Sequence, residues 1–328
     1  MKKLLIITVL LVAAAIYGAV TWLGAEAEEK NSAFRKEFSA TAAKIDSQYR
    51  HKDTTIKGTK WHYVEQGPAD GPVILFLHGL PECWYSWRYV MPLIEPKYRQ
   101  IVLDMKGYGR SDKQDDDYNW HVVARQILEL MDSQDIRRFF VVGHDWGSLI
   151  GSVLVSDYPD RILGFVRMQA DLIRTGILRS LMRKPQFLLF QSNWLGTRFM
   201  EDAARFIDMV YPPRMATEFK PLDRDYLVYE FARDGVARQI PKYFKVKNWD
   251  LDAAMTKICK EAFPFPVLIL QGDKDASQPV SLFENVPTGC PRVELRWIRD
   301  ANHFSNFDKP EEVAEAINEF LGRSRLQR

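Results

Sequence analysis

From Thr54 onward, short apolar runs alternate with stretches of helical spacing, and this alternation restricts the fold more than any other feature of the sequence. Residues 72–77 (PVILFL) and 100–104 (QIVLD) are mostly apolar, as buried parallel strands tend to be. Strands that alternate with helices form a parallel sheet with helices on both faces. We therefore predict a mostly parallel α/β fold, with a hairpin at 54–65, further strands at 139–142, 162–168, 267–271 and 293–298, and helices at 119–132, 147–157 and 311–321.

Residues 171–263 interrupt this rhythm. The segment is rich in Phe, Trp, Tyr, Met and Arg, and its spacing is helical. Such an insertion between two strands is expected to cover the edge of the sheet, and its aromatic side chains imply an apolar substrate pocket at the junction. We therefore predict a core in two parts, 53–170 and 264–328, with a helical cap at 171–263 between them.

The charge balance and the cysteine count exclude several classes of protein. The chain of 328 residues carries 45 Lys and Arg against 43 Asp and Glu, a net charge of +2, which is too small for nucleic acid to be the expected partner. Its three cysteines cannot form a paired disulfide framework. The sequence contains no metal-ligand spacing, so we expect a small-molecule substrate and neither metal nor cofactor.

The N-terminal segment begins with two lysines close together, followed by an uncharged run at 4–24. As a helix at about 1.5 Å per residue, this run would be about 31 Å long, close to the bilayer core of about 30 Å. We therefore predict a single-pass membrane anchor at 1–24, a linker helix at 25–52 and a lipophilic substrate that partitions into the membrane. Alternatively, the small-x-small pattern at 25–27 is a signal cleavage site and the protein is secreted or periplasmic.

The sequence Gly143-His144-Asp145-Trp146-Gly147 stands between a predicted strand and a predicted helix. It has the frame Gly-x-nucleophile-x-Gly of a nucleophile elbow, in which the glycines allow a tight turn and the helix N-terminus stabilises negative charge. The central carboxylate can attack a saturated carbon, and water must then hydrolyse the alkyl-enzyme ester with the help of a general base. This chemistry suits an epoxide or a carbon–halogen bond. The alternative is that Asp145 merely caps the helix.

Two further segments follow the last predicted strands. His303 lies in Asp-Ala-Asn-His-Phe after the strand at 293–298, and Gly-Asp-Lys-Asp at 272–275 follows the strand before it. We predict His303 as the general base and Asp275 as the acid that orients its imidazole and stabilises its cationic form. Asp275 is preferred because it stands three residues after the glycine, and Asp273 is the alternative.

The loop His78-Gly79-Leu80-Pro81 follows the strand at 72–77. We expect it to present the backbone N–H of Leu80 beside the elbow, with the N–H of Trp146 as a second donor. Together these groups would hold the oxyanion while the ester is hydrolysed. His78 itself is expected to be a structural residue of the loop.

With these residues identified, the chain resembles the α/β-hydrolase superfamily and, within it, looks most like the epoxide hydrolases. The resemblance covers roughly residues 54–322. It implies the α/β-hydrolase fold, the chain order nucleophile, acid, histidine, and the opening of an epoxide to a vicinal diol through an ester on Asp145. The matching segments are HGLPECWYSWR (78–88), DMKGYGRSD (104–112), GHDWG (143–147), GDKD (272–275) and DANHF (300–304).

The resemblance also implies roles for the cap. Epoxide hydrolases carry two cap tyrosines that donate hydrogen bonds to the epoxide oxygen. Tyr243, in GVARQIPKYF, is similar to the second, whereas Leu189 stands where the first is expected. We expect Phe187, Phe190 and Trp194 to line the substrate pocket.

The main alternative is a haloalkane dehalogenase, which is similar in fold and nucleophile. There the leaving halide is held by indole N–H groups, for which Trp146 and Trp194 are candidates. Many dehalogenases have Asn where this chain has Leu80, and some have the acid where it has Gln169, so both positions favour an epoxide hydrolase. A ligand receptor without turnover, which also occurs on this fold, is the remaining alternative.

Overall fold

The computed structural model describes the backbone of residues 2–170, 189–245, 263–284, 286 and 293–326, and the side chains of residues 24–324 within these ranges. Its centre is an eight-stranded sheet with the order β1-β2-β4-β3-β5-β6-β7-β8. The strands from β3 to β8 run parallel, while β1 and β2 form an antiparallel hairpin at one edge. The strands are β1 (Arg50–Ile56), β2 (Thr59–Gln66), β3 (Val73–Leu77), β4 (Arg99–Leu103), β5 (Phe139–His144), β6 (Ile162–Met168), β7 (Val267–Gly272) and β8 (Val293–Ile298).

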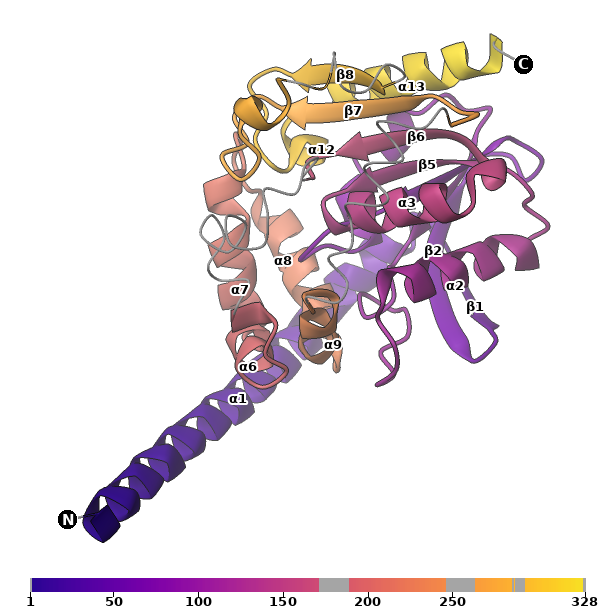
Figure 1. Cartoon of the computed structure of the whole chain (residues 1–328). Coiled ribbons are helices and arrows are strands. Elements are labelled where there is room, and N and C mark those ends of the chain that lie inside the picture. The colour runs from indigo at the N-terminus through magenta and orange to yellow at the C-terminus, as the bar shows by residue number, and fades with distance from the viewer. Residues whose placement is uncertain (1, 171–188, 246–262, 285, 287–292, 327–328) are drawn as a thin grey trace.

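Helices cover both faces of this sheet (Figure 1). On one face α2 packs beside α3, and on the other lies α13, whose Phe320 ring reaches Gly164 of β6. This is the mostly parallel α/β arrangement predicted from the sequence. Outside the cap, the helices after β2 are α2 (Trp120–Ser133), α3 (Trp146–Asp157), α12 (Ser305–Asp308) and α13 (Pro310–Leu326), with 3-10 turns at η1 (Trp84–Trp87), η2 (Met91–Leu93), η3 (Pro159–Arg161) and η6 (Val280–Leu282).

The described part of the inserted segment is helical. Figure 1 shows its helices beside the edge of the sheet at which the arrowheads of β6 and β7 end, which is the carboxyl edge. Residues 171–188 and 246–262, which also belong to the predicted cap, lie outside the described residues. The helices are α6 (Leu195–Met200), α7 (Ala203–Val210), α8 (Pro221–Phe231) and α9 (Val236–Tyr243), with a 3-10 turn at η4 (Pro212–Arg214).

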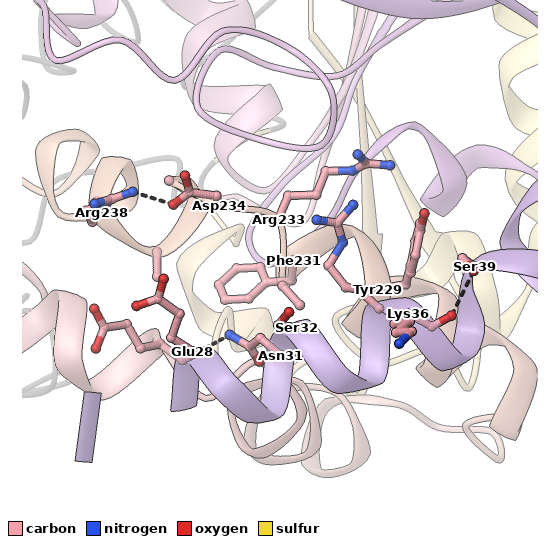
Figure 2. Close-up of a pocket in the computed structure, with 15 residues that line it drawn as sticks. Glu28, Asn31, Ser32, Lys36, Ser39, Tyr229, Phe231, Arg233, Asp234 and Arg238 are labelled. Atoms are coloured by element: carbon pink, nitrogen blue, oxygen red, sulfur yellow. Dashed lines mark hydrogen bonds and ion pairs between the residues drawn. The ribbon is translucent and has the colours of Figure 1, made fainter. Parts of the chain in front are cut away.

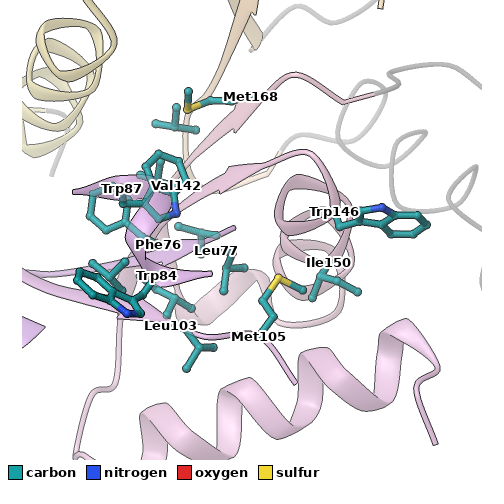
Figure 3. Close-up of a cluster of buried hydrophobic side chains, with 14 of the residues drawn as sticks. Phe76, Leu77, Trp84, Trp87, Leu103, Met105, Val142, Trp146, Ile150 and Met168 are labelled. Carbon is teal, nitrogen blue, oxygen red and sulfur yellow. The ribbon is translucent and has the colours of Figure 1, made fainter. Parts of the chain in front are cut away.

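The core is built on the two faces of the central strands (Figure 3). Phe76 of β3 packs against Trp87 at a ring distance of 5.1 Å, and the next residue, Leu77, points to the opposite face, toward Ile150 of α3. Successive side chains of a strand alternate in this way, so a strand that is covered on both faces is apolar at every position. The rigid strands and α3 thereby fix the backbone around residue 145.

A single helix, α1 (Lys2–Asp46), precedes the sheet. Its first part extends away from the rest of the molecule, and its later part runs along the cap helices α6 and α8 (Figure 1). The last residue, Asp46, accepts a hydrogen bond from the Tyr226 hydroxyl at 2.5 Å and pairs with Arg110. The helix expected at 25–52 corresponds to the second part of α1, which ends at Asp46, and β1 begins at Arg50.

The structure contradicts the predicted membrane anchor. Among the residues whose side chains are described, no helix combines the length and apolar character needed to cross a bilayer. From Gly24 onward α1 carries charged residues such as Glu26 and Glu28, so this part of the helix is too polar to cross a bilayer. The earlier part of the predicted anchor, 1–23, lies outside the described side chains. The single-pass anchor at 1–24 and the membrane location are therefore withdrawn.

A polar groove of about 550 Å³ lies between α1 and the turn that joins α8 to α9 (Figure 2). Its walls carry charged side chains from both elements, such as Glu28 and Lys36 of α1 and Arg233 and Asp234 of the turn. Neither Asp145 nor His303 lines it. This groove is thus separate from the edge of the sheet at which the predicted site residues meet.

Candidate active site

Asp145 stands between β5 and α3 in a strained backbone conformation. Its φ and ψ are 47° and −116°, a combination that costs about 1–3 kcal/mol for a residue with a side chain. The neighbouring glycines make the turn possible. A Cβ at Gly147 would lie 2.2 Å from the carbonyl oxygen of Leu77, and one at Gly143 would lie 2.6 Å from the carbonyl oxygen of Gly147. The turn therefore holds the Asp145 carboxylate at the edge of the sheet, where 22 % of the side chain is exposed.

The imidazole of His303 lies between two carboxylates. Its Nδ1 is 2.9 Å from Oδ2 of Asp275, and its Nε2 is 3.5 Å from Oδ2 of Asp145. The three residues follow β5, β7 and β8, whose carboxyl ends meet at one edge of the sheet. The alternative acid, Asp273, instead accepts a hydrogen bond from the N–H of Asp300 at 2.8 Å. The geometry thus brings together Asp145, His303 and Asp275.

The Asp275 carboxylate is surrounded by donors. Oδ1 accepts hydrogen bonds from the N–H and the hydroxyl of Ser277 at 2.9 and 2.6 Å, and Oδ2 accepts one from Gln271 Nε2 at 3.2 Å. Burial alone would raise the pKa of Asp275, but the charge and hydrogen bond of His303, together with these donors, hold it well below its usual range. Asp275 is therefore an ionised acceptor that fixes the imidazole with Nδ1 toward it.

The two carboxylates act on His303 in the same direction. Burial disfavours the imidazolium, but the charge of Asp275 and the hydrogen bond to Asp145 outweigh burial and raise the pKa of His303 to about 10. For Asp145, burial raises the pKa, while the hydrogen bond and charge of His303 lower it, and the net pKa is below the ordinary value. At neutral pH the free site therefore holds an imidazolium between two carboxylates.

The loop after β3 closes on Asp145 from the other side. The backbone N–H of Leu80 donates to Asp145 Oδ1 at 3.1 Å. The loop approaches so closely that a Cβ at Gly79 would lie 2.5 Å from the Asp145 Cβ. Trp146, which carries the second predicted donor, is the first residue of α3. The first predicted donor, the backbone N–H of Leu80, thus contacts the carboxylate directly. The backbone N–H of Trp146 lies at the N-terminus of α3, next to Asp145.

A buried pair beneath the elbow was missed by the sequence analysis. Glu82 Oε1 lies 2.9 Å from Nδ1 of His144, and both side chains are fully buried. Glu82 Oε2 accepts the Gly79 N–H at 2.6 Å, and His144 Nε2 is 2.8 Å from the carbonyl oxygen of His303. The pair therefore joins the Leu80 loop, the elbow and the His303 loop. In the sequence, both residues lie inside segments that carry the family resemblance, Glu82 in HGLPECWYSWR and His144 in GHDWG.

Tyr243 is buried beside the elbow, with its ring centroid 6.3 Å from that of Trp146. Its hydroxyl donates to the carbonyl oxygen of Lys106 at 2.7 Å. A phenol has one proton to donate, so Tyr243 must leave this carbonyl before it can donate to a substrate. Burial raises the pKa of the phenol, which keeps it protonated.

The three predicted lining residues differ in their positions. Phe190 is buried, and its ring lies 5.2 Å from that of Phe244, which in turn lies 4.6 Å from the ring of Trp146. Trp194 is 37 % exposed and lines a surface groove to which none of Asp145, His303 and Asp275 contributes. Phe187 lies outside the described residues. An aromatic chain thus connects Phe190 to the elbow.

Comparison with known proteins gives matches along most of the chain. A family model described as alpha/beta hydrolase fold matches residues 72–310. Epoxide hydrolase B of Mycobacterium tuberculosis is 35 % identical over a match that covers 83 % of this chain and 98 % of that protein. Among solved structures, Cfl2 from Burkholderia cenocepacia superposes with a TM-score of 0.74 at 25 % identity, covering 83 % of this chain and 96 % of that one. Haloalkane dehalogenase DbeA from Bradyrhizobium elkani has a TM-score of 0.71 at 21 % identity, covering 85 % and 100 %.

Proposed function

We propose that this chain, which belongs to the α/β-hydrolase family, is a hydrolase that opens epoxides to vicinal diols through an ester on Asp145. The observation that carries the proposal is the position of the Asp145 carboxylate, whose Oδ1 is held by the Leu80 N–H and whose Oδ2 faces His303. The similarity to a protein named epoxide hydrolase, at 35 % identity, supports the same substrate class.

In the first half-reaction, Asp145 Oδ2 attacks one carbon of the epoxide ring. A carbon–oxygen bond of the ring breaks, and the departing oxygen takes a proton, which we assign to the Tyr243 hydroxyl. The phenolate regains a proton from the His303 imidazolium through solvent, which leaves Tyr243 as a phenol and His303 as a neutral imidazole. Asp145 is thereby converted from a carboxylate to a neutral ester. Loss of its charge removes one of the groups that raise the pKa of His303, so the imidazole becomes a better base when the ester is present.

In the second half-reaction, His303 Nε2 takes a proton from water, and the hydroxide adds to Cγ of Asp145. The negative charge develops on Oδ1, where the Leu80 N–H already donates and the Trp146 N–H is the proposed second donor. The bond between Cγ and Oδ2 then breaks, and the leaving alkoxide takes the proton from His303. The proton that remains on the new Asp145 carboxyl group passes to His303, which restores the carboxylate and the imidazolium of the free site. Asp275 stabilises the imidazolium throughout.

The aromatic chain from Phe190 through Phe244 to Trp146 supports an apolar epoxide as the substrate. The dehalogenase alternative needs indole donors around the leaving halide. Trp146 directly follows Asp145, and Trp194 lines a surface groove to which Asp145 does not contribute. The 35 % identity to a protein named epoxide hydrolase, against 21 % to a dehalogenase structure, favours the epoxide over the halide.

The test is a single turnover with styrene oxide in ¹⁸O-labelled water. The label is expected in the Asp145 carboxylate rather than in the diol, because water attacks Cγ. In His303→Gln, intact-protein mass should rise by the mass of the whole epoxide and stay raised. His121→Gln, at an exposed histidine on α2, is the matched control and should turn over normally.

Three outcomes would contradict the proposal. Label that appears only in the diol would mean that water attacks the epoxide directly. Release of halide from 1-chlorohexane, with no diol from styrene oxide, would favour the dehalogenase. A ligand that stays bound without product in the wild-type protein would indicate a receptor.

A further inference from the structure

The loop that carries His303 is joined to the cap by one buried carboxylate. Asp308, at the end of α12, is 6 % exposed. Its Oδ1 accepts three hydrogen bonds from the cap, from the N–H of Ala216 at 2.9 Å and from the N–H and hydroxyl of Thr217 at 3.0 and 2.9 Å. Its Oδ2 accepts the N–H of Asn302 at 2.9 Å, one residue before His303. One side chain thus ties the cap segment after η4 to the histidine loop.

Two further contacts join the same segments. The backbone N–H of His303 donates to the carbonyl oxygen of Arg214 at 3.0 Å, so the cap holds the main chain of the proposed base directly. The ring of Tyr211 stacks on Phe304, the next residue after the histidine, with a centroid distance of 4.0 Å and an interplanar angle of 8°. The position of the imidazole therefore depends on the position of residues 211–217 of the cap.

The nucleophile is held by other elements. Asp145 is fixed by the turn between β5 and α3 and by the Leu80 N–H, none of which contacts Asp308 in the described residues. A change at the junction between Asp308 and the cap should therefore move the base while leaving the nucleophile in place. A catalytic group displaced by about 1 Å can lose about 100-fold in rate.

We propose that Asp308 is a positioning residue that couples the cap to His303 and thereby controls the second half-reaction, the hydrolysis of the ester. This inference rests on the proposed function, because it assigns a separate role to each half-reaction. Residues 211–217 of the cap would then have two roles. They would help to cover the site, and they would hold the loop that carries His303. Displacement of this cap segment would withdraw His303 from the ester.

The test separates the two half-reactions in Asp308→Asn. The three donors of the cap favour retention of the oxygen at the Oδ1 position, so the new amide nitrogen faces the Asn302 N–H and that hydrogen bond is lost. Rapid mixing with styrene oxide, followed by intact-protein mass measurement, gives the rates at which the ester forms and decays. We expect formation within about twofold of wild type and decay slowed by about 10- to 100-fold, so that kcat falls while kcat/KM is kept.

The matched control is Asp223→Asn, which alters another buried carboxylate between cap and core. Asp223 accepts hydrogen bonds from the hydroxyls of Tyr85 and Tyr89 at 3.2 and 3.1 Å, and it has no bond to the His303 loop in the described residues. It should leave the ratio of the two rates unchanged. If Asp308→Asn does not fold, Thr217→Val removes one donor on the exposed side of the same junction, with Thr55→Val on β1 as its control.

The outcomes distinguish this inference from the proposed function. A normal ester lifetime in both junction variants, or equal slowing of ester decay in Asp223→Asn, would overturn the positioning role alone. Absence of any ester in wild-type protein and in His303→Gln would overturn the proposed function, and this inference with it. Slower ester decay in the junction variants alone, with formation kept, is the expected result.

Discussion

Nε2 of His303 lies 3.5 Å from Oδ2 of Asp145, so the proposed base and the proposed nucleophile form an ion pair before a substrate binds. An imidazolium cannot accept the proton of water. The pair therefore keeps the base inactive until Asp145 becomes a neutral ester. This relationship gives the two half-reactions an order that is set by charge alone, and it leads to the first two predictions.

Asp145→Asn should lower the pKa of His303, because the neutral amide imitates the loss of charge on ester formation. The pKa of the folded wild-type residue is raised to about 10 by Asp275 and Asp145 against burial, and the variant keeps only Asp275. The measurement is a titration of the histidine ring signals by NMR in both proteins. An unchanged His303 titration would show that Asp145 does not influence the base.

The stability of the folded protein should depend on His303 over a defined pH range. The pKa of His303 is about 10 in the folded protein and about 6.5 in an unfolded chain, so the folded state retains a proton that the unfolded chain loses. This stabilisation is complete below about pH 6.5 and is lost as the pH rises toward about 10. The difference in Tm between wild type and His303→Gln should therefore shrink across that range. A constant difference would contradict the assigned pKa.

Glu82→Gln should destabilise the protein although it preserves the shape of the side chain. The substitution removes the negative charge that raises the pKa of His144 against full burial, so that pKa falls and the fully buried contact between the two side chains loses its carboxylate. We expect a loss of about 1–3 kcal/mol in the free energy of unfolding, measured with urea. The control is Glu129→Gln, which breaks the solvent-exposed pair with Lys57 and should cost less than about 1 kcal/mol. Equal effects would mean that burial of the pair is unimportant.

Tyr243→Phe should slow formation of the ester and leave its decay unchanged, because the phenol is assigned only to the first half-reaction. The variant also loses the hydrogen bond to Lys106, so its Tm is measured alongside. Tyr63→Phe in β2, which removes a weak 3.4 Å contact to Gln134, is the control and should alter neither rate. Normal ester formation in Tyr243→Phe would assign the proton to another group.

Gly147→Ala should distort the elbow and abolish turnover, whereas Gly322→Ala should stabilise the folded protein. At Gly147 the new Cβ would lie 2.2 Å from a backbone oxygen that cannot move aside, so the elbow must shift and activity should be lost. At Gly322, within α13, a Cβ meets nothing within 4 Å, and alanine should stabilise the helix by about 0.5–1 kcal/mol. The measurements are thermal unfolding and turnover of styrene oxide, and a fully active Gly147→Ala would contradict the tight-turn argument.

Much of the candidate site could be predicted because its signals are local. The elbow needs two glycines around Asp145 within five residues, and the apolar runs on either side determine which strand precedes it and which helix follows. His303 and Asp275 could be added because parallel strands end at one edge of the sheet. The wrong prediction was the membrane anchor, in which an apolar run at 4–24 was read as an independent element. Among the residues whose side chains are described, no helix is long and apolar enough to cross a bilayer, and α1 runs without a break from Lys2 to Asp46.

By itself, the sequence determined the alternation of strands and helices, the strained turn at Asp145 and the order in which the site residues follow the strands, since each depends on neighbours along the chain. The tertiary structure chose Asp275 over the alternative Asp273 as the acid that faces His303. It alone decided that Glu82 pairs with His144, that the Tyr243 hydroxyl is bound to the Lys106 carbonyl, and that Asp308 joins the histidine loop to a cap segment about 90 residues earlier. The physical reason is that a buried polar group takes whichever partner the fold brings within about 3 Å, and residues far apart in the chain leave no pattern of spacing that identifies it.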